Sequence, residues 1–267
     1  MSELLRLTRE GPAEDVARVT LTRPEVRNAF NAQLIAELTA VFADLANEPP
    51  ESLRAVVLAG EGTTFCAGAD VTWMRASLDL SVAQNEADAA RLAEMLAAID
   101  NCAVPVIARV QGAALGGGMG LCAVADIVLA TADATFGFTE TRLGILPAVI
   151  SPFVLAKIGE GPARALFPTG ERFGAERALR IGLVHEVFAD LPALDERLAD
   201  ILDGIHAAGP TAARAAKAVI RDQRGLDADD RRRLTVQAIA RQRTSAEGQE
   251  GLTAFLDKRP PSWQRRD

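Results

Sequence analysis

The sequence predicts an α/β fold, and two observations lead to that prediction. Short apolar runs that read as buried strands alternate with segments of helical apolar spacing in the first part of the chain. From about Pro192 onward the pattern is only helical. Strands that alternate with helices are typical of largely parallel pairing. We therefore expect an α/β core over residues 1–190 and a helical C-terminal region over residues 191–267.

The individual elements follow from local patterns in chain order. Residues 4–9 and 16–21 read as a strand pair around a turn at Gly11-Pro12. Residues 31–46 have helical apolar spacing behind Asn31, whose side chain can cap a helix. Further strands are expected at 54–60, 105–110 and 127–130, and further helices at 84–100, 117–125, 192–207, 210–222, 227–244 and 246–257.

Composition limits the class of protein. With 267 residues, of which 49% are hydrophobic, the chain can bury a sizeable core. The net charge of −7 argues against a nucleic-acid surface. No apolar run approaches the ~20 residues of a membrane span, and the N-terminus lacks a signal-peptide pattern. The odd set Cys66, Cys102 and Cys122 has no metal-type spacing, so we expect buried free thiols and a cytoplasmic location.

A run of glycines, Gly116 to Gly118, is the most informative local feature. It follows an apolar strand and opens directly into an apolar helix. Glycines at a helix start let a ligand approach the backbone, and the unpaired N–H groups and the helix dipole favour negative charge there. Such a site suits a phosphate or a developing oxyanion. A dinucleotide site is excluded, because Leu121 stands where a third glycine would be needed.

A second loop of small residues follows the strand at 54–60. The segment Ala67-Gly68-Ala69-Asp70 again offers an open backbone at the end of a strand. Two such loops could each direct one N–H at the same oxygen atom. That arrangement would form an oxyanion hole for a thioester enolate.

Together, four ordered motifs resemble the enoyl-CoA hydratase/isomerase (crotonase) family over nearly the whole chain. They are Leu21-Thr-Arg-Pro-Glu-Val-Arg-Asn-Ala-Phe30, Phe65-Cys-Ala-Gly-Ala-Asp70 with Ala114-Leu-Gly-Gly-Gly118, Phe136-Gly-Phe-Thr-Glu-Thr-Arg-Leu-Gly-Ile-Leu-Pro147, and Phe255-Leu-Asp-Lys-Arg-Pro-Pro-Ser-Trp263. The resemblance implies a ββα spiral core, a helical trimerisation region, and homotrimers or hexamers. It also implies an acyl-CoA substrate, in which coenzyme A is part of the substrate and no separate cofactor is needed.

The resemblance also assigns roles to residues. It implies catalytic N–H groups on Ala67 and Gly117, and an acid/base at Glu140, whose pKa apolar neighbours should raise. The family's other acid position falls on Gly120, which has no carboxylate. The implied substrate-binding residues are Arg27, Ala29, Ala67, Gly68, Ala69, Asp70, Trp73, Gly117 and Lys258. No metal site is expected, and neither His185 nor His206 has a nucleophile partner in the sequence pattern.

Three functions remain open at this stage. Finer motifs, among them Ala148-Val-Ile-Ser-Pro152, resemble the methylglutaconyl-CoA hydratase branch of bacterial leucine and isoprenoid degradation. This implies hydration of a branched, carboxylated enoyl-CoA (3-methylglutaconyl-CoA type), with Arg75 and Arg142 as candidates for the distal carboxylate. The alternatives are a double-bond isomerase that uses Glu140 alone and a CoA-binding family member without activity.

Overall fold

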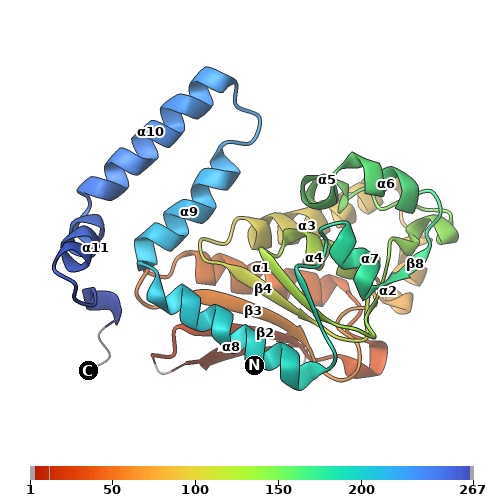
Figure 1. The fold of residues 1–267 in the computed structure, drawn as a ribbon. Helices are drawn as coiled ribbons and strands as arrows, with labels where there is room; N and C mark the ends of the chain where they lie inside the picture. The colour runs from red at the N-terminus through yellow and green to blue at the C-terminus, as the bar shows by residue number, and fades with distance from the viewer. Residues whose placement is uncertain (1–3, 12, 265–267) are drawn as a thin grey trace.

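A six-stranded sheet forms the centre of the molecule, as the computed structural model of the chain shows (Figure 1). The structure describes residues 4–11 and 13–264, so Pro12 of the expected turn lies outside the described residues. The strand order is β1-β2-β3-β4-β6-β9, in which β1 and β2 pair antiparallel and all later neighbours pair parallel. A smaller sheet has the order β5-β7-β8. The expected α/β class with largely parallel pairing is confirmed.

The bounds of the elements are close to those expected from the pattern. The strands are β1 Leu5–Glu10, β2 Val16–Leu21, β3 Ala55–Gly60, β4 Val106–Val110, β5 Ala113–Leu115, β6 Ile127–Thr131, β7 Thr135–Gly137, β8 Arg172–Gly174 and β9 Glu186–Phe188. The helices are α1 Ala32–Ala46, α2 Val71–Ser77, α3 Val82–Asp100, α4 Gly117–Val124, α5 Ser151–Ile158, α6 Glu160–Leu166, α7 Ala175–Arg180, α8 Leu191–Ala207, α9 Pro210–Asp222, α10 Ala228–Thr244 and α11 Ala246–Leu256, with short 3-10 turns η1 Pro24–Val26, η2 Thr139–Leu143 and η3 Ser262–Gln264.

Capping side chains explain where two of these helices begin. Asn31 caps α1 as expected, because its side chain accepts a hydrogen bond from the Leu34 N–H at 2.8 Å. Helix α3 begins two residues before the expected position. Ser81 and Gln84 form a capping box there, in which each side chain accepts from the other residue's backbone N–H.

Helices cover both faces of the central sheet. On one face, α1, α3 and α4 pack their buried residues against β2, β3, β4 and β6 in the main apolar core. On the other face, Leu194 and Leu198 of α8 pack against Val16, Val57 and Ile107. The expected division at residue 190 therefore falls just before a helix that packs against the sheet.

Arg54 ties the beginning of β3 to the end of α8. Its guanidinium is buried, and Nη2 donates to the carbonyl oxygens of Ile205 at 2.8 Å and Ala208 at 2.6 Å. Both carbonyls lie at the C-terminus of α8, where the last carbonyls lack the regular helical hydrogen bond, although the Ala208 N–H also donates to the Ile205 carbonyl at 3.2 Å. One cation therefore fixes two segments about 150 residues apart in the sequence.

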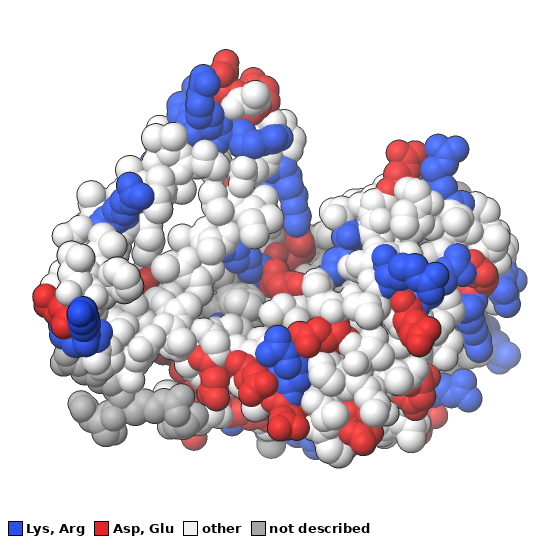
Figure 2. All heavy atoms as spheres, in the orientation of Figure 1, with Lys and Arg blue, Asp and Glu red and all other residues white. Residues whose placement is uncertain are grey.

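Helices α9, α10 and α11 extend away from the body as an arm (Figure 1). Within the described residues, α9 and α10 contain no buried residue and α11 contains only Ala254. Charged side chains gather at the tip of the arm, while much of the rest of its face in view is uncharged (Figure 2). In the first turns of α10, Arg232 and Arg233 form ion pairs with Asp229 and Asp230, three residues earlier. Large apolar side chains are exposed on the arm: Ile220, Val236, Ile239, Leu252, Phe255 and Leu256.

Candidate active site

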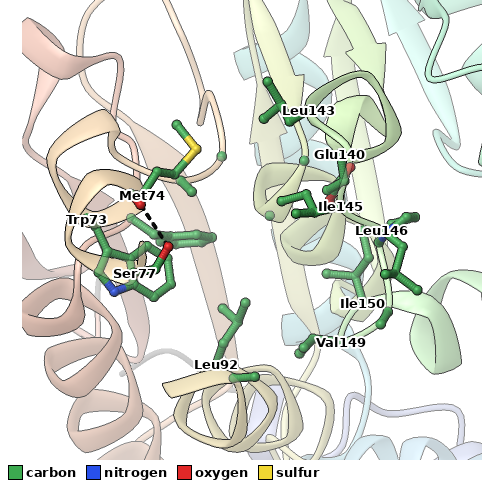
Figure 3. A pocket seen from close by; sticks show the side chains of 18 of the residues that line it. Trp73, Met74, Ser77, Leu92, Glu140, Leu143, Ile145, Leu146, Val149 and Ile150 are labelled. Atoms are coloured by element: carbon green, nitrogen blue, oxygen red, sulfur yellow. Dashed lines mark hydrogen bonds between the residues drawn. The ribbon is translucent and has the colours of Figure 1, made fainter. Parts of the chain in front are cut away.

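A cavity of about 300 Å³ lies beside the two glycine-containing loops. One wall comes from α2 and α3 and carries Trp73, Met74 and Leu92, and the opposite wall comes from residues 139–150 (Figure 3). Ala67, Gly68, Ala69, Gly116 and Gly117 also line the cavity. The structure thus brings both predicted loops, the predicted acid and Trp73 to one place.

Backbone hydrogen bonds fix the first loop. The Cys66 N–H donates to the Ala113 carbonyl at 3.0 Å, and the Phe30 N–H donates to the Gly68 carbonyl at 2.7 Å. The Ala67 N–H donates to the Arg27 carbonyl at 3.0 Å. Because that donor is already used, the expectation that Ala67 supplies an oxyanion-hole N–H is wrong.

Ala69 supplies the free N–H of this loop instead. Ala69 pairs with Phe30 in a parallel bridge made by the Gly68 carbonyl and the Asp70 N–H. Successive backbone groups of an extended chain point to opposite sides, so the Ala69 N–H points away from Phe30. It donates to no acceptor within residues 4–11 and 13–264. Ala69 is among the residues that the family resemblance predicts to bind substrate.

The second loop places Gly117 at the first position of α4. Its N–H belongs to the first helical turn and has no acceptor among the described residues. Gly116 has φ 51° and ψ −119°, and Gly68 has φ 92°, values that favour glycine. A Cβ placed on Gly68 would lie 3.4 Å from the Gly117 nitrogen, so the two loops are in contact.

Glu140 directs its carboxylate at the same loops. A Cβ placed on Gly116 would lie only 3.5 Å from Glu140 Oε1. Oε2 is buried and has no hydrogen-bond partner in the described structure. Burial raises the pKa of this carboxyl group, although a backbone hydrogen bond acts in the opposite direction. A desolvated carboxyl group with one oxygen free of partners is suited to proton transfer.

Asp70 has a structural role, which corrects its assignment to substrate binding. Its Oδ2 accepts from Arg23 Nη2 at 2.7 Å, and Oδ1 accepts from the Thr72 N–H at 2.7 Å at the N-terminus of α2. The side chains of Arg23 and Asp70 are only 11% and 8% exposed. Burial acts to raise the pKa of Asp70, but these hydrogen bonds outweigh it and lower the pKa.

Three other predicted residues lie outside the cavity wall. Ala29 is buried beneath the loops, where its carbonyl accepts from Arg23. Arg27 and Lys258 are exposed, and both have positive φ angles of 55°. Both residues lie on the surface, outside the acyl cavity. Their contact with coenzyme A stays a prediction.

The two arginines considered for a distal carboxylate differ in their surroundings. Arg142 is exposed, and its Nε donates to the Thr169 carbonyl at 3.5 Å. Arg75 is exposed in the last turn of α2, between the cavity residues Met74 and Ser77. Its guanidinium forms no ion pair within the described residues. Neither arginine lines the cavity.

Several cavity residues had no signal in the sequence. Apart from Phe30, they belong to α2, α3, η2 or the irregular segment between η2 and α5, where apolar periodicity is absent or indicates only a helix face. The carboxylate of Asp88 accepts from Arg91 at 2.6 Å and is thus already paired. The missed lining residues are Phe30, Met74, Ser77, Asn85, Asp88, Ala89, Leu92, Thr139, Ile145, Leu146 and Pro147.

The other reactive side chains have structural partners. His185 Nδ1 accepts from the Val128 N–H at 2.9 Å, and His206 Nε2 lies 3.0 Å from Asp15 Oδ1. All three cysteines are free and buried, as expected, and burial raises the pKa of Cys66 to about 12. No cluster of His, Cys, Asp and Glu that could hold a metal occurs among the residues described. Nor does any described helix have the length and apolar character to cross a bilayer.

Known proteins share both the sequence and the fold of this chain. Residues 11–266 match the family model described as Enoyl-CoA hydratase/isomerase. The chain is 36% identical to the probable enoyl-CoA hydratase of Rhodobacter capsulatus over 263 residues, which covers 95% of this chain and 96% of that protein. It superimposes on an enoyl-CoA hydratase from Shewanella pealeana with a TM-score of 0.91 and 36% identity, covering 97% and 96% of the two chains. For AtuE of Pseudomonas aeruginosa the TM-score is 0.93 at 38% identity, with 98% and 100% covered.

Proposed function

The chain belongs to the enoyl-CoA hydratase/isomerase family, and on that premise we propose that it reversibly adds water to an enoyl-CoA thioester. Its fold is the crotonase-like α/β fold, with the C-terminal helical region present. One observation carries the proposal: the carboxylate of Glu140 faces two unpaired N–H groups, those of Ala69 and Gly117, across one largely apolar cavity.

The proposed chemistry uses these three groups. The thioester oxygen accepts hydrogen bonds from the Ala69 and Gly117 N–H groups, which stabilise the negative charge that develops on it. Glu140 takes a proton from water as the water oxygen bonds to C3 of the acyl chain. The protonated carboxyl group then returns a proton to C2, so the carboxylate is regenerated and one water molecule is consumed.

A double-bond isomerase is the second candidate. It needs a single acid/base that moves a proton between C2 and C4, and Glu140 is the one unpaired carboxylate on the described cavity wall. The same two N–H groups would stabilise the dienolate oxygen. Hydratase and isomerase therefore differ in whether water enters the cavity beside Glu140.

For the acyl group, the proposal keeps the branched, carboxylated chain of the 3-methylglutaconyl-CoA type. Two features support it: Arg75 offers a positive charge, and the negative charge of Asp88 is already paired. Asp88 is neutralised by Arg91 and does not present a free negative charge. Arg75 is an exposed cation of α2, whose neighbours Met74 and Ser77 line the cavity, and a movement of its flexible side chain would pair it with a distal carboxylate.

The proposal also includes a homotrimer or hexamer. The exposed apolar side chains of the arm, such as Phe255 and Leu256, support it because contiguous exposed apolar surface is typical of interfaces. Lys258 lies next to them and carries a positive charge suited to a phosphate of coenzyme A, as does the exposed Arg27. The cytoplasmic location remains a prediction.

A substrate screen tests the reaction. Purified protein is mixed with crotonyl-CoA, a 3-enoyl-CoA and 3-methylglutaconyl-CoA, and the absorbance of the conjugated thioester is followed. A hydratase removes this absorbance from the conjugated substrates, whereas an isomerase creates it from the 3-enoyl-CoA. Equal kcat/KM on the charged and uncharged conjugated substrates would contradict the carboxylated acyl chain.

Arg75→Met tests the proposed carboxylate contact. We expect kcat/KM for 3-methylglutaconyl-CoA to fall by at least ~10-fold, the size of one lost charged hydrogen bond, with little change for crotonyl-CoA. Arg142→Met is the matched control, because that arginine bonds to the Thr169 carbonyl. Parallel losses on both substrates in Arg75→Met would remove Arg75 from acyl recognition.

A further inference from the structure

Gly120 and Ile150 meet inside the wall of the acyl cavity. Gly120 lies in α4, and Ile150 stands at the N-terminus of α5. A Cβ placed on Gly120 would lie 2.7 Å from Ile150 Cγ2, a distance that real Cβ atoms essentially never show. The side chain of Leu96 in α3 would lie 3.3 Å from the same Cβ. The Ile150 side chain therefore uses the space that every residue other than glycine would fill.

Ile150 also forms part of the cavity surface. It is only 2% exposed, yet it lines the cavity together with Val149 and Glu140, on the wall opposite Trp73 (Figure 3). One face of the Ile150 side chain thus contacts α4, and another faces the acyl group. Because Gly120 and Leu96 are buried, a displaced Ile150 can move chiefly toward the cavity.

We propose that Gly120 and Ile150 form a coupled pair that determines which acyl chains the cavity accepts. Because Gly120 has no Cβ, the Ile150 side chain packs against α4 instead of projecting further into the cavity. In this position, Ile150 forms the boundary of the cavity on that side. The proposal rests on the acyl-CoA site proposed above and adds a specificity-determining residue to it. Its tests use binding as well as turnover.

Two single substitutions should change specificity in opposite directions. Gly120→Ala pushes Ile150 into the cavity, so longer acyl chains should lose affinity relative to short ones. Ile150→Ala removes Cγ2 and opens the wall, so longer chains should gain. We expect the ratio of Kd for octanoyl-CoA to that for butyryl-CoA to move by ~10-fold each way, since a few methylenes in a pocket have effects of that size.

The double variant separates coupling from two independent effects. In Gly120→Ala/Ile150→Ala the 2.7 Å contact with Ile150 Cγ2 is gone, and only the Leu96 side chain at 3.3 Å has to shift slightly. The thermal midpoint should therefore lie close to that of Ile150→Ala alone. The chain-length ratio should be indistinguishable from that of Ile150→Ala. The matched control is Gly120→Ala/Val149→Ala. Val149 lines the cavity, but the atoms nearest to a Gly120 Cβ belong to Ile150 and Leu96.

The outcomes are distinguishable from failure of the hydratase proposal. Saturated acyl-CoA molecules bind without reacting, so calorimetry reports the cavity even if no enoyl-CoA is hydrated. Additive effects on both the thermal midpoint and the chain-length ratio would overturn the coupled pair, whatever the enzyme's activity. Wild-type binding without hydration or isomerisation would overturn the proposed function and leave the coupled pair standing.

Discussion

The two sides of the cavity differ in the kind of group that they present. On one side, residues 66–69 and 116–118 present backbone N–H groups that hydrogen bonds to neighbouring strands hold in place. On the other side, residues 139–150 present side chains from a 3-10 turn and an irregular segment. None of this segment belongs to a strand. It carries Glu140 and Leu143 on the 3-10 turn, and Ile145 and Leu146 on the irregular chain that follows (Figure 3).

This difference separates what is general from what is specific in the site. Backbone donors are tolerant of side-chain identity, so the oxyanion side depends on a few glycines and on the hydrogen bonds beneath them. The opposite side depends on individual side chains, since Glu140 supplies the proton transfer and Ile150 shapes the acyl wall. Substitutions should therefore have different consequences on the two sides.

The largest effect is expected on the side-chain face, at Glu140. Glu140→Gln keeps the shape but cannot exchange a proton, so kcat should fall by ~10²–10⁴-fold while acyl-CoA binding survives. In the wild type, the limb of the pH–rate profile due to this group should lie above that of a solvent-exposed glutamate, because burial raises its pKa. That limb should vanish in the variant. An active Glu140→Gln enzyme would transfer the acid/base role to another residue.

The stability of the same variant provides a control of opposite sign. A carboxyl group whose pKa is raised by folding stabilises the folded state below its unfolded pKa, and this contribution is lost as the pH rises through the folded value. At neutral pH, Glu140→Gln should therefore unfold at a higher temperature than the wild type. A lower midpoint would indicate that activity was lost through misfolding.

On the backbone face, removal of the Gly117 N–H should have the next largest effect. Gly117→Pro removes the donor, and one lost oxyanion-hole donor typically costs ~3–4 kcal/mol, or ~10²–10³-fold in kcat. Any side chain here also meets the ring of Phe30, because a Cβ would lie 2.8 Å from it. Gly117→Ala adds that Cβ and keeps the N–H, so the ratio between the two variants isolates the donor. Equal activities would exclude the Gly117 N–H from the mechanism.

Substitution of Asp70, beneath the backbone face, should have the smallest effect on kcat but a large effect on the free energy of unfolding. Asp70→Asn leaves Arg23 as an unpaired buried cation, and loss of one partner of a buried pair costs ~3 kcal/mol of unfolding free energy. The pKa of Asp70 is lowered, so its contribution exists above the unfolded pKa and is lost as the pH falls through the folded value. Urea unfolding at neutral and at acid pH should show the difference shrinking in acid. A constant difference would contradict the ion pair as its source.

The sequence was sufficient for the α/β class and for elements with a long periodic pattern. Helix α1 with its Asn31 cap and the strands on either side of it belong to this group, because their apolar spacing is clear. Strands β5, β7 and β8 have three residues each, too few for any period to be visible. These short strands and the isolated bridges hold the two loops together, so the construction of the site depends on pairing that the sequence does not show.

The candidate site was predicted in part. Glycine spacing and motif resemblance located Gly117 and Glu140, but they could not show which N–H of the first loop is free. That depends on the Arg27 carbonyl, which lies about 40 residues earlier and reaches Ala67 only in the folded chain. The role of Asp70 depends likewise on Arg23. A resemblance alone also could not reveal that Ile150 occupies the space beside Gly120.

The bond between Arg54 and the end of α8 has a consequence for synthesis on the ribosome. Strand β3 leaves the exit tunnel long before Ile205 and Ala208 do, so the guanidinium of Arg54 must stay hydrated until then. Until α8 has been synthesised, Val57 and Ile107 on one face of the sheet also lack the contact with Leu194 that buries them in the folded protein. Apolar surface that is exposed in this way favours aggregation, so we expect this face to depend on chaperones until α8 has been synthesised and covers it.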